Sequence, residues 1–285
     1  MAVPERVVIS GAGCCTALGH DLDSVARSLR EGRDAFRASG ALEGLSVCPA
    51  EDWGQDGARQ QFEGWRHRHY LNRGSRMAVL SGLRALRDAG LEAGLPVRSQ
   101  IIAAVGPMLD VTGEPGLPPQ DTATLGALWL LRWLPNTAAG ALARFARCHG
   151  EALTVNAACA SALQALGEGW RRIRFGLADA VLVAAGDSRL SLGGLLGYHK
   201  ARALSLCAPG TGPRPFDMGR DGFVPGEGGA AFVLESLSSA QARGAHVHAE
   251  ILGYGASVDA ESLTAPEARG TWAELAVRGA LEEAG

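Results

Sequence analysis

The sequence predicts an α/β fold in which helices cover parallel sheets. Short, apolar, β-branched runs alternate along the chain with segments of helical periodicity. Of the 285 residues, 47% are apolar and 20% are charged, which is typical of a soluble globular protein. The net charge of −3 gives no basic footprint for nucleic acid. The length fits one large domain or two small ones, with a sizeable core.

The first strand and the first helix have recognisable boundaries. Residues 7–10 form a β-branched run that ends at Gly11 and Gly13, which predicts a buried strand running into a tight turn. A helix follows, with Asp21 near its start and Gly32 after its end.

The next region contains an irregular segment and then the strongest helical signal. Residues 39–70 lack a regular pattern, and we expect an elaborated loop there. In residues 75–89 the apolar side chains recur at helical spacing, and Gly90 supplies a stop. Residues 101–105 predict a strand, and residues 110–120, rich in glycine and proline, predict a loop.

The alternation of strands and helices continues to the last residue. Further helices are expected at residues 121–134, 137–147, 160–175, 237–243 and 271–284. Further strands are expected at residues 153–155, 180–185, 230–234 and 247–257. A long loop at residues 207–225 precedes the third of these strands.

Several function classes are disfavoured by the sequence. The N terminus has no basic segment followed by a long apolar one, so we expect no secretory signal and a cytoplasmic location. The most apolar window, residues 125–134, is broken by Arg132 and is shorter than the roughly 20 residues of a membrane helix. The six cysteines show no Cys-x-x-Cys pair, so we expect reduced thiols and no metal site.

Cys159 is the candidate nucleophile, because it lies between a predicted strand and the start of a predicted helix. The N terminus of a helix favours negative charge, and the thiolate is the nucleophilic form of cysteine. The small neighbours Ala157, Ala158, Ala160 and Ser161 would let a thioester approach closely. The alternative is that Cys159 is a small buried hydrophobic side chain, as free cysteines commonly are.

Four blocks of sequence occur in a recognisable order. They are VISGAGCCTALG at residues 8–19, LPNTAAG at 134–140, NAACAS at 156–161 and RPFDMGRDGFVPGEG at 214–228. Together they resemble the β-ketoacyl-acyl carrier protein synthases, the elongating condensing enzymes of fatty acid and polyketide assembly. The last block is the most specific of the four.

The resemblance implies a thiolase-like fold, in which two similar halves stack as α-β-α-β-α layers. Residues 1–285 would form the ketosynthase N-terminal region, with the first half at about 1–235 and the start of the second half at about 236–285. The two catalytic histidines of the family come from a later part of the second half. We therefore expect the C-terminal part of the second half to be absent and these histidines to come from a missing or separate part.

The resemblance also implies a mechanism. Cys159 would accept an acyl chain from the phosphopantetheine thiol of acyl carrier protein, and the acyl-enzyme would then condense with malonyl-carrier protein. The backbone N–H of Cys159 would form part of the oxyanion hole. No cofactor or metal is expected. The expected partners are acyl carrier protein and a second ketosynthase-type subunit, in a homodimer or a heterodimer.

Residues near the pocket are also implied by the resemblance. Phe223, Gly222 and Ser161 would line or shape the substrate pocket. Ion pairs and backbone hydrogen bonds would hold the neighbouring loop together through Arg214, Asp217, Arg220, Asp221 and Glu227.

Other interpretations of the sequence stay open or are weak. A non-catalytic partner of a complete ketosynthase, similar to a chain-length factor, is the alternative function, and a truncated product of low stability is a third possibility. None of the seven histidines is a credible replacement for the catalytic pair. His246 and His248 could suggest a metal pair, but two ligands without a third make a weak site. Gly11 and Gly13 suggest a dinucleotide fingerprint that fails at Thr16.

Overall fold

A six-stranded sheet with the order β5-β4-β6-β7-β1-β8 forms the centre of the molecule. The computed structural model describes residues 4–108, 126–206 and 212–285. The sheet consists of β1 (Val7–Thr16), β4 (Ser99–Val105), β5 (Ala152–Thr154), β6 (Ala180–Ser188), β7 (Glu227–Ser236) and β8 (Ala249–Ile251). A separate antiparallel pair consists of β2 (Arg37–Ala38) and β3 (Ser46–Val47).

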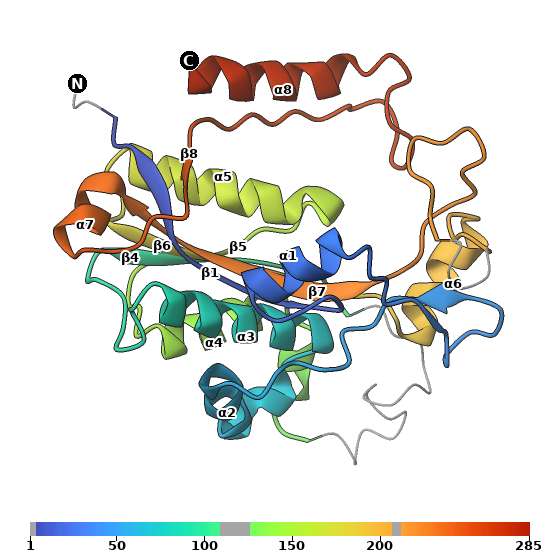
Figure 1. Cartoon of the computed structure of the whole chain (residues 1–285), viewed down its shortest axis with the longest axis horizontal. Helices are drawn as coiled ribbons and strands as arrows, with labels where there is room; N and C mark the ends of the chain where they lie inside the picture. The colour runs from blue at the N-terminus through green and yellow to red at the C-terminus, as the bar shows by residue number, and fades with distance from the viewer. Residues whose placement is uncertain (1–3, 109–125, 207–211) are drawn as a thin grey trace.

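Helices cover both faces of this sheet. They are α1 (Leu22–Arg30), α2 (Gly57–Glu63), α3 (Arg73–Asp88), α4 (Asn136–Phe145), α5 (Ser161–Arg174), α6 (Leu192–Lys200), α7 (Leu237–Ala242) and α8 (Thr271–Ala284). Short 3-10 helices are η1 (Arg66–Tyr70), η3 (Trp129–Arg132) and η4 (Ala158–Ala160). Figure 1 shows α3 and α4 on one face, α5 on the other, and α8 beyond α5. No helix in the described ranges is long and apolar enough to cross a membrane.

The sheet is mixed, which corrects the expectation of wholly parallel sheets. β4 pairs in parallel with β5 and β6, but β7 runs antiparallel to both β6 and β1, and β8 is antiparallel to β1. An apolar run indicates that a strand is buried without giving its direction. Direction depends on the connection: β6 ends at Ser188 and β7 begins beside it at Glu227, so the chain re-enters the sheet at the end where it left and runs back along β6.

Helix α3 lies directly on the sheet because glycines occupy the strand positions beneath it. A Cβ atom at Gly11, Gly13, Gly186 or Gly229 would come within 2.2 to 2.6 Å of α3 backbone atoms. The expected turn at Gly11 is therefore wrong: β1 continues to Thr16, with a bulge just before Gly11. These glycines serve close packing, and the turn follows β1.

The two faces of the sheet carry separate apolar cores. On the α3 and α4 side, Phe62, Met77 and Leu142 are almost fully buried. On the α5 side, Trp170 and Leu234 are among the largest fully buried members. Burial of side chains of this size stabilises the fold by about 1.5–3 kcal/mol each.

The segment after β8 adds further layers beyond α5. A Cβ at Gly167 of α5 would meet the ring of Tyr254, and Cβ atoms at Gly253 and Gly255 would meet the backbone of α8. The extended chain around Tyr254 thus lies between α5 and α8, as Figure 1 shows. The order of helices, sheet, helix, extended chain and helix fits the layered fold that was expected. None of the 14 residues of α8 is buried.

Three further expectations need correction. The strand expected at 247–257 is limited to Ala249–Ile251, because among the described residues β8 pairs only with residues 7–9 of β1. The helix expected at 121–134 is reduced in its described part to η3, which follows Leu128 in the left-handed region, φ 62°. Residues 39–70 are more regular than expected, because they contain α2, η1 and the short pair β2–β3. The loop expected at 110–120 lies outside the described residues.

Candidate active site

Cys159 lies in η4, between β5 and α5, and its side chain is exposed to solvent. The interpretation of Cys159 as a buried hydrophobic thiol is therefore wrong. Cys14, Cys15 and Cys148 are buried by contrast. Burial raises the pKa of the Cys15 thiol to about 11. Of these four thiols, only Cys159 is open to a substrate from solvent.

A strained turn presents Cys159. The residue before it, Ala158, adopts the left-handed region with φ 49°, which costs a non-glycine residue about 1–2 kcal/mol. The Ser161 hydroxyl holds this turn from both sides. It accepts a hydrogen bond from the Ala157 N–H at 2.7 Å and donates one to the Ala158 carbonyl at 2.7 Å. A sharp turn between a strand and a helix, with the nucleophile at its tip, exposes a side chain for attack.

Cys159 opens into a cavity of about 650 Å³. Small residues line much of it, including Asn156, Ser161, Ala162, Gly228, Gly229 and Ala230. Asp187 and Arg189 contribute charge to its wall, and their side chains form an ion pair at 3.0 Å. Arg189 also donates a hydrogen bond to the Pro107 carbonyl at 2.7 Å, which fixes the end of β4. The cavity combines an exposed thiol with space for a chain of several carbon atoms.

Phe223 and Gly222 lie one layer behind this cavity. The Phe223 ring meets the Tyr198 ring edge-on, with centroids 5.2 Å apart, and Tyr198 lines the cavity. The Phe223 N–H donates to the Ala203 carbonyl at 3.0 Å. Gly222 has φ 140°, and a Cβ there would come within 2.6 Å of the same carbonyl. These two residues therefore support Tyr198, while Ser161 lines the cavity itself.

The loop residues contact one another. Arg214 donates to the Gly219 carbonyl and lies 3.9 Å from Asp221. The Asp217 carboxylate accepts from the Gly219 N–H at 2.6 Å, and Arg220 donates to the Asp217 carbonyl at 3.0 Å. These contacts fold the loop on itself, and none of these residues lines the Cys159 cavity.

Glu227 makes longer-range contacts, because its carboxylate is fully buried and joins three elements. Arg73 of α3 donates two hydrogen bonds to it, at 2.6 and 2.5 Å. The Ala50 N–H donates at 3.0 Å and the Ser188 hydroxyl at 2.7 Å. The hydrogen bonds to Glu227 raise the pKa of Arg73. Sequence reasoning missed Arg73 and Ser188, since nothing in their local sequence indicates a distant carboxylate.

The histidines lie outside the Cys159 cavity. All seven belong to the described residues, and none of them lines it. The His248 Nε2 lies 2.5 Å from the Asp88 carboxylate. The centroids of the His246 and His248 rings are 4.6 Å apart. Within the described residues no group of three or more metal-ligating side chains is found.

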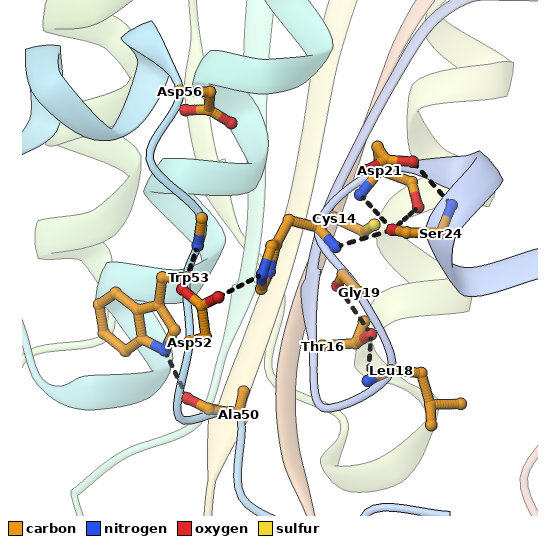
Figure 2. Close-up of polar contacts among 12 residues, drawn as sticks. Cys14, Thr16, Leu18, Gly19, Asp21, Ser24, Ala50, Asp52, Trp53 and Asp56 are labelled. Atoms are coloured by element: carbon orange, nitrogen blue, oxygen red, sulfur yellow. Dashed lines mark hydrogen bonds and ion pairs between the residues drawn. The ribbon is translucent and has the colours of Figure 1, made fainter. Parts of the chain in front are cut away.

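His20 lies between two segments of the framework. Its Nε2 lies 3.6 Å from the Asp52 carboxylate, and its backbone N–H donates to the Ser24 hydroxyl at 3.3 Å. In Figure 2 the turn that carries Thr16, Gly19 and Asp21 faces the segment that carries Ala50, Asp52 and Asp56. His20 thus connects the end of β1 to the segment that precedes α2.

A family model described as "Beta-ketoacyl synthase, N-terminal domain" matches residues 4–240. The chain belongs to the β-ketoacyl synthase family. This confirms the resemblance drawn from the four sequence blocks. The division of the chain at about residue 235 stays a prediction.

Relatives and solved structures agree with this assignment. The chain is 27% identical to 3-oxoacyl-[acyl-carrier-protein] synthase 2 of Vibrio cholerae, over 99% of this chain and 70% of that protein. A β-ketoacyl synthase structure from Burkholderia phymatum matches with a TM-score of 0.81 and 29% identity, over 98% of this chain and 70% of that one. The ishigamide ketosynthase/chain length factor matches with a TM-score of 0.81 and 30% identity, over 99% and 70%. The fold is thus thiolase-like, and the chain spans about 70% of the length of these proteins.

Proposed function

We propose that this chain is a β-ketoacyl synthase-type acyltransferase subunit whose Cys159 accepts an acyl chain from acyl carrier protein. The observation that carries the proposal is the exposed thiol at a left-handed turn that opens into a cavity of about 650 Å³. The relative from Vibrio cholerae is named for a reaction on acyl carrier protein, which supports the same substrate class.

The proposed step is a thioester exchange. The Cys159 Sγ thiolate attacks the carbonyl carbon of the acyl-phosphopantetheine thioester, and the backbone N–H of Cys159 stabilises the developing oxyanion. The carrier thiolate leaves and takes up a proton. The acyl group is then held on Sγ for condensation with malonyl-carrier protein, in fatty acid or polyketide biosynthesis.

Condensation needs hydrogen-bond donors that stabilise the negative charge developing on the thioester carbonyl oxygens, and we propose that histidines from a missing or separate C-terminal part supply them. The exposed surface of α8 supports this, since Trp272, Leu275 and Leu281 are apolar and between 38% and 66% exposed. Apolar side chains exposed along one helix are typical of a surface that contacts further polypeptide. Beyond Ile251, no strand of the described part pairs with the extended segment that leads to α8.

The test is acylation of the purified chain by an acyl-carrier thioester, followed by intact mass. The wild-type chain is expected to gain one acyl mass, and Cys159→Ala is expected to gain none. Cys48→Ala is the matched control, because Cys48 is a partly exposed thiol outside the cavity. Equal acylation of wild type and Cys159→Ala refutes the proposal.

The second candidate function is a non-catalytic partner of a complete ketosynthase. The match to a ketosynthase/chain length factor structure favours it. In that case the chain co-purifies with a ketosynthase as a heterodimer, and Cys159→Ala leaves the activity of the heterodimer unchanged. Loss of that activity in Cys159→Ala favours the acyltransferase function.

A further inference from the structure

A second cavity, of about 520 Å³, adjoins the Cys159 cavity. Gly106, Pro107 and Asp187 line both. The wall of the second cavity differs from that of the first, because it carries many charged and polar groups. They include Arg37, Glu51, Asn72, Arg73, Arg132, Ser188 and Glu227.

Most of the charges deep in this cavity are already paired. Glu227 accepts hydrogen bonds from Arg73, and Asp187 forms an ion pair with Arg189. Arg37 and Glu51 are exposed to solvent. These groups therefore need no further partner.

Arg132 is the exception. Its Nε is buried and has no hydrogen-bond partner, and among the described residues no carboxylate lies within 4.0 Å of its guanidinium. A second cation, Arg76, lies near enough to feel its charge. The pKa of Arg76 is lowered by burial and, next, by the charge of Arg132. A partly buried guanidinium beside another cation is costly unless an anion pairs with it.

An acyl chain with no polar group would increase the free-energy cost of the unpaired Arg132 guanidinium. A chain that leaves Cys159 and passes Gly106 and Pro107 enters the cavity with Arg132. Apolar atoms there would remove water from the guanidinium and offer no hydrogen bond in return. A carboxylate would accept charge-assisted hydrogen bonds, which guanidinium groups make with two parallel N–H donors.

We propose that the second cavity selects acyl chains that carry an anionic group at their far end, and that Arg132 pairs with this group. The class of substrate is thus a dicarboxylic acid bound through one thioester, rather than a plain fatty acyl chain. This inference rests on the proposed function, since it requires the acyl group to be attached to Cys159.

The test compares two thioesters of equal carbon number, hexanoyl and adipoyl N-acetylcysteamine, as acyl donors to the full chain. The rate of mass gain on Cys159 is the measurement. The wild-type chain is expected to react about tenfold faster with the adipoyl donor, because one charge-assisted pair contributes at least that factor. A suberoyl and octanoyl pair repeats the comparison at a greater length.

The variants separate recognition from folding. Arg132→Gln is expected to lose the preference for the carboxylated donor, because the adipoyl rate falls and the desolvation penalty on the hexanoyl chain is relieved. Arg132→Lys is expected to retain part of the preference. Arg30→Gln, at an exposed arginine of α1 that lines neither cavity, is the matched control. If Arg132→Gln does not fold, the inference is tested by the preference of the wild-type chain at both chain lengths and by the preference that Arg132→Lys retains.

The outcomes distinguish the two claims. Equal or faster reaction of the neutral donors with the wild-type chain overturns the inference and leaves acylation of Cys159 intact. A preference that persists in Arg132→Gln also overturns the role of Arg132. If no donor acylates Cys159, the proposed function fails, and the inference fails with it.

Discussion

Replacement of Ser161 by alanine tests how the turn before α5 holds the candidate nucleophile. The hydroxyl makes two hydrogen bonds of 2.7 Å, to the Ala157 N–H and the Ala158 carbonyl. Each such bond contributes about 0.5–1.5 kcal/mol. Together they offset the cost of about 1–2 kcal/mol for the left-handed conformation of Ala158. Ser161→Ala is expected to lower the free energy of unfolding by about 1–3 kcal/mol.

The same substitution is expected to slow acylation more than it weakens substrate binding. The turn relaxes when the hydroxyl is lost, so that the Cys159 thiol spends less time in the reactive position, and we expect a decrease of about tenfold in the acylation rate. Urea denaturation gives the stability, and the dependence of the acylation rate on thioester concentration separates rate from binding. Ser161→Thr keeps the hydroxyl and is expected to retain most of the rate. If Ser161→Ala acylates at the wild-type rate and unfolds at the wild-type urea concentration, the hydroxyl does not hold the turn.

Three other predictions concern the framework. Glu227→Gln is expected to destabilise the fold by about 2–3 kcal/mol in urea, because it leaves Arg73 unpaired, whereas Glu43→Gln at an exposed glutamate is expected to have no effect. Gly13→Ala is expected to prevent soluble expression or to lower the thermal midpoint strongly, since its Cβ would lie 2.2 Å from the Ser81 carbonyl; a normal midpoint contradicts the close packing of α3. The raised pKa of Cys15, about 11, means that the folded chain retains a proton that the unfolded chain loses near pH 9. Stability is therefore expected to fall by about 2–3 kcal/mol between pH 9 and 11, and this fall should be absent in Cys15→Ala.

Much of the fold follows from local sequence signals. The helix after Asp21, the long helix that stops before Gly90 and the helix after Cys159 all lie close to where periodicity and end signals placed them. These signals act over a few residues, so that they can be interpreted without knowledge of the tertiary structure.

Features that depend on distant partners could not be predicted in the same way. The direction of β7 is set by how the chain returns to the sheet, and the helix expected before Pro135 is interrupted at Leu128 by a backbone conformation that its sequence does not indicate. Gly11 resembles a turn residue in sequence, although α3 is what requires it.

In the candidate site, too, local features could be predicted from the sequence and features that depend on distant residues could not. The position of Cys159 between a strand and a helix was predicted, and its exposure agrees with a reactive role. Arg132 was visible in the sequence only as a charged residue that interrupts an apolar run. That it lines the second cavity becomes apparent only when η3 is brought next to the ends of β4 and β6.

The most direct test of the central claim is to locate the acyl group after reaction with an acyl-carrier thioester. Proteolysis and peptide mass mapping identify the modified residue among the six cysteines. The acyl mass is expected on the peptide that contains Cys159, and on no other cysteine peptide. Acylation confined to a different cysteine, or no acylation of a folded chain, would contradict the assignment of Cys159 as the acyl-accepting nucleophile.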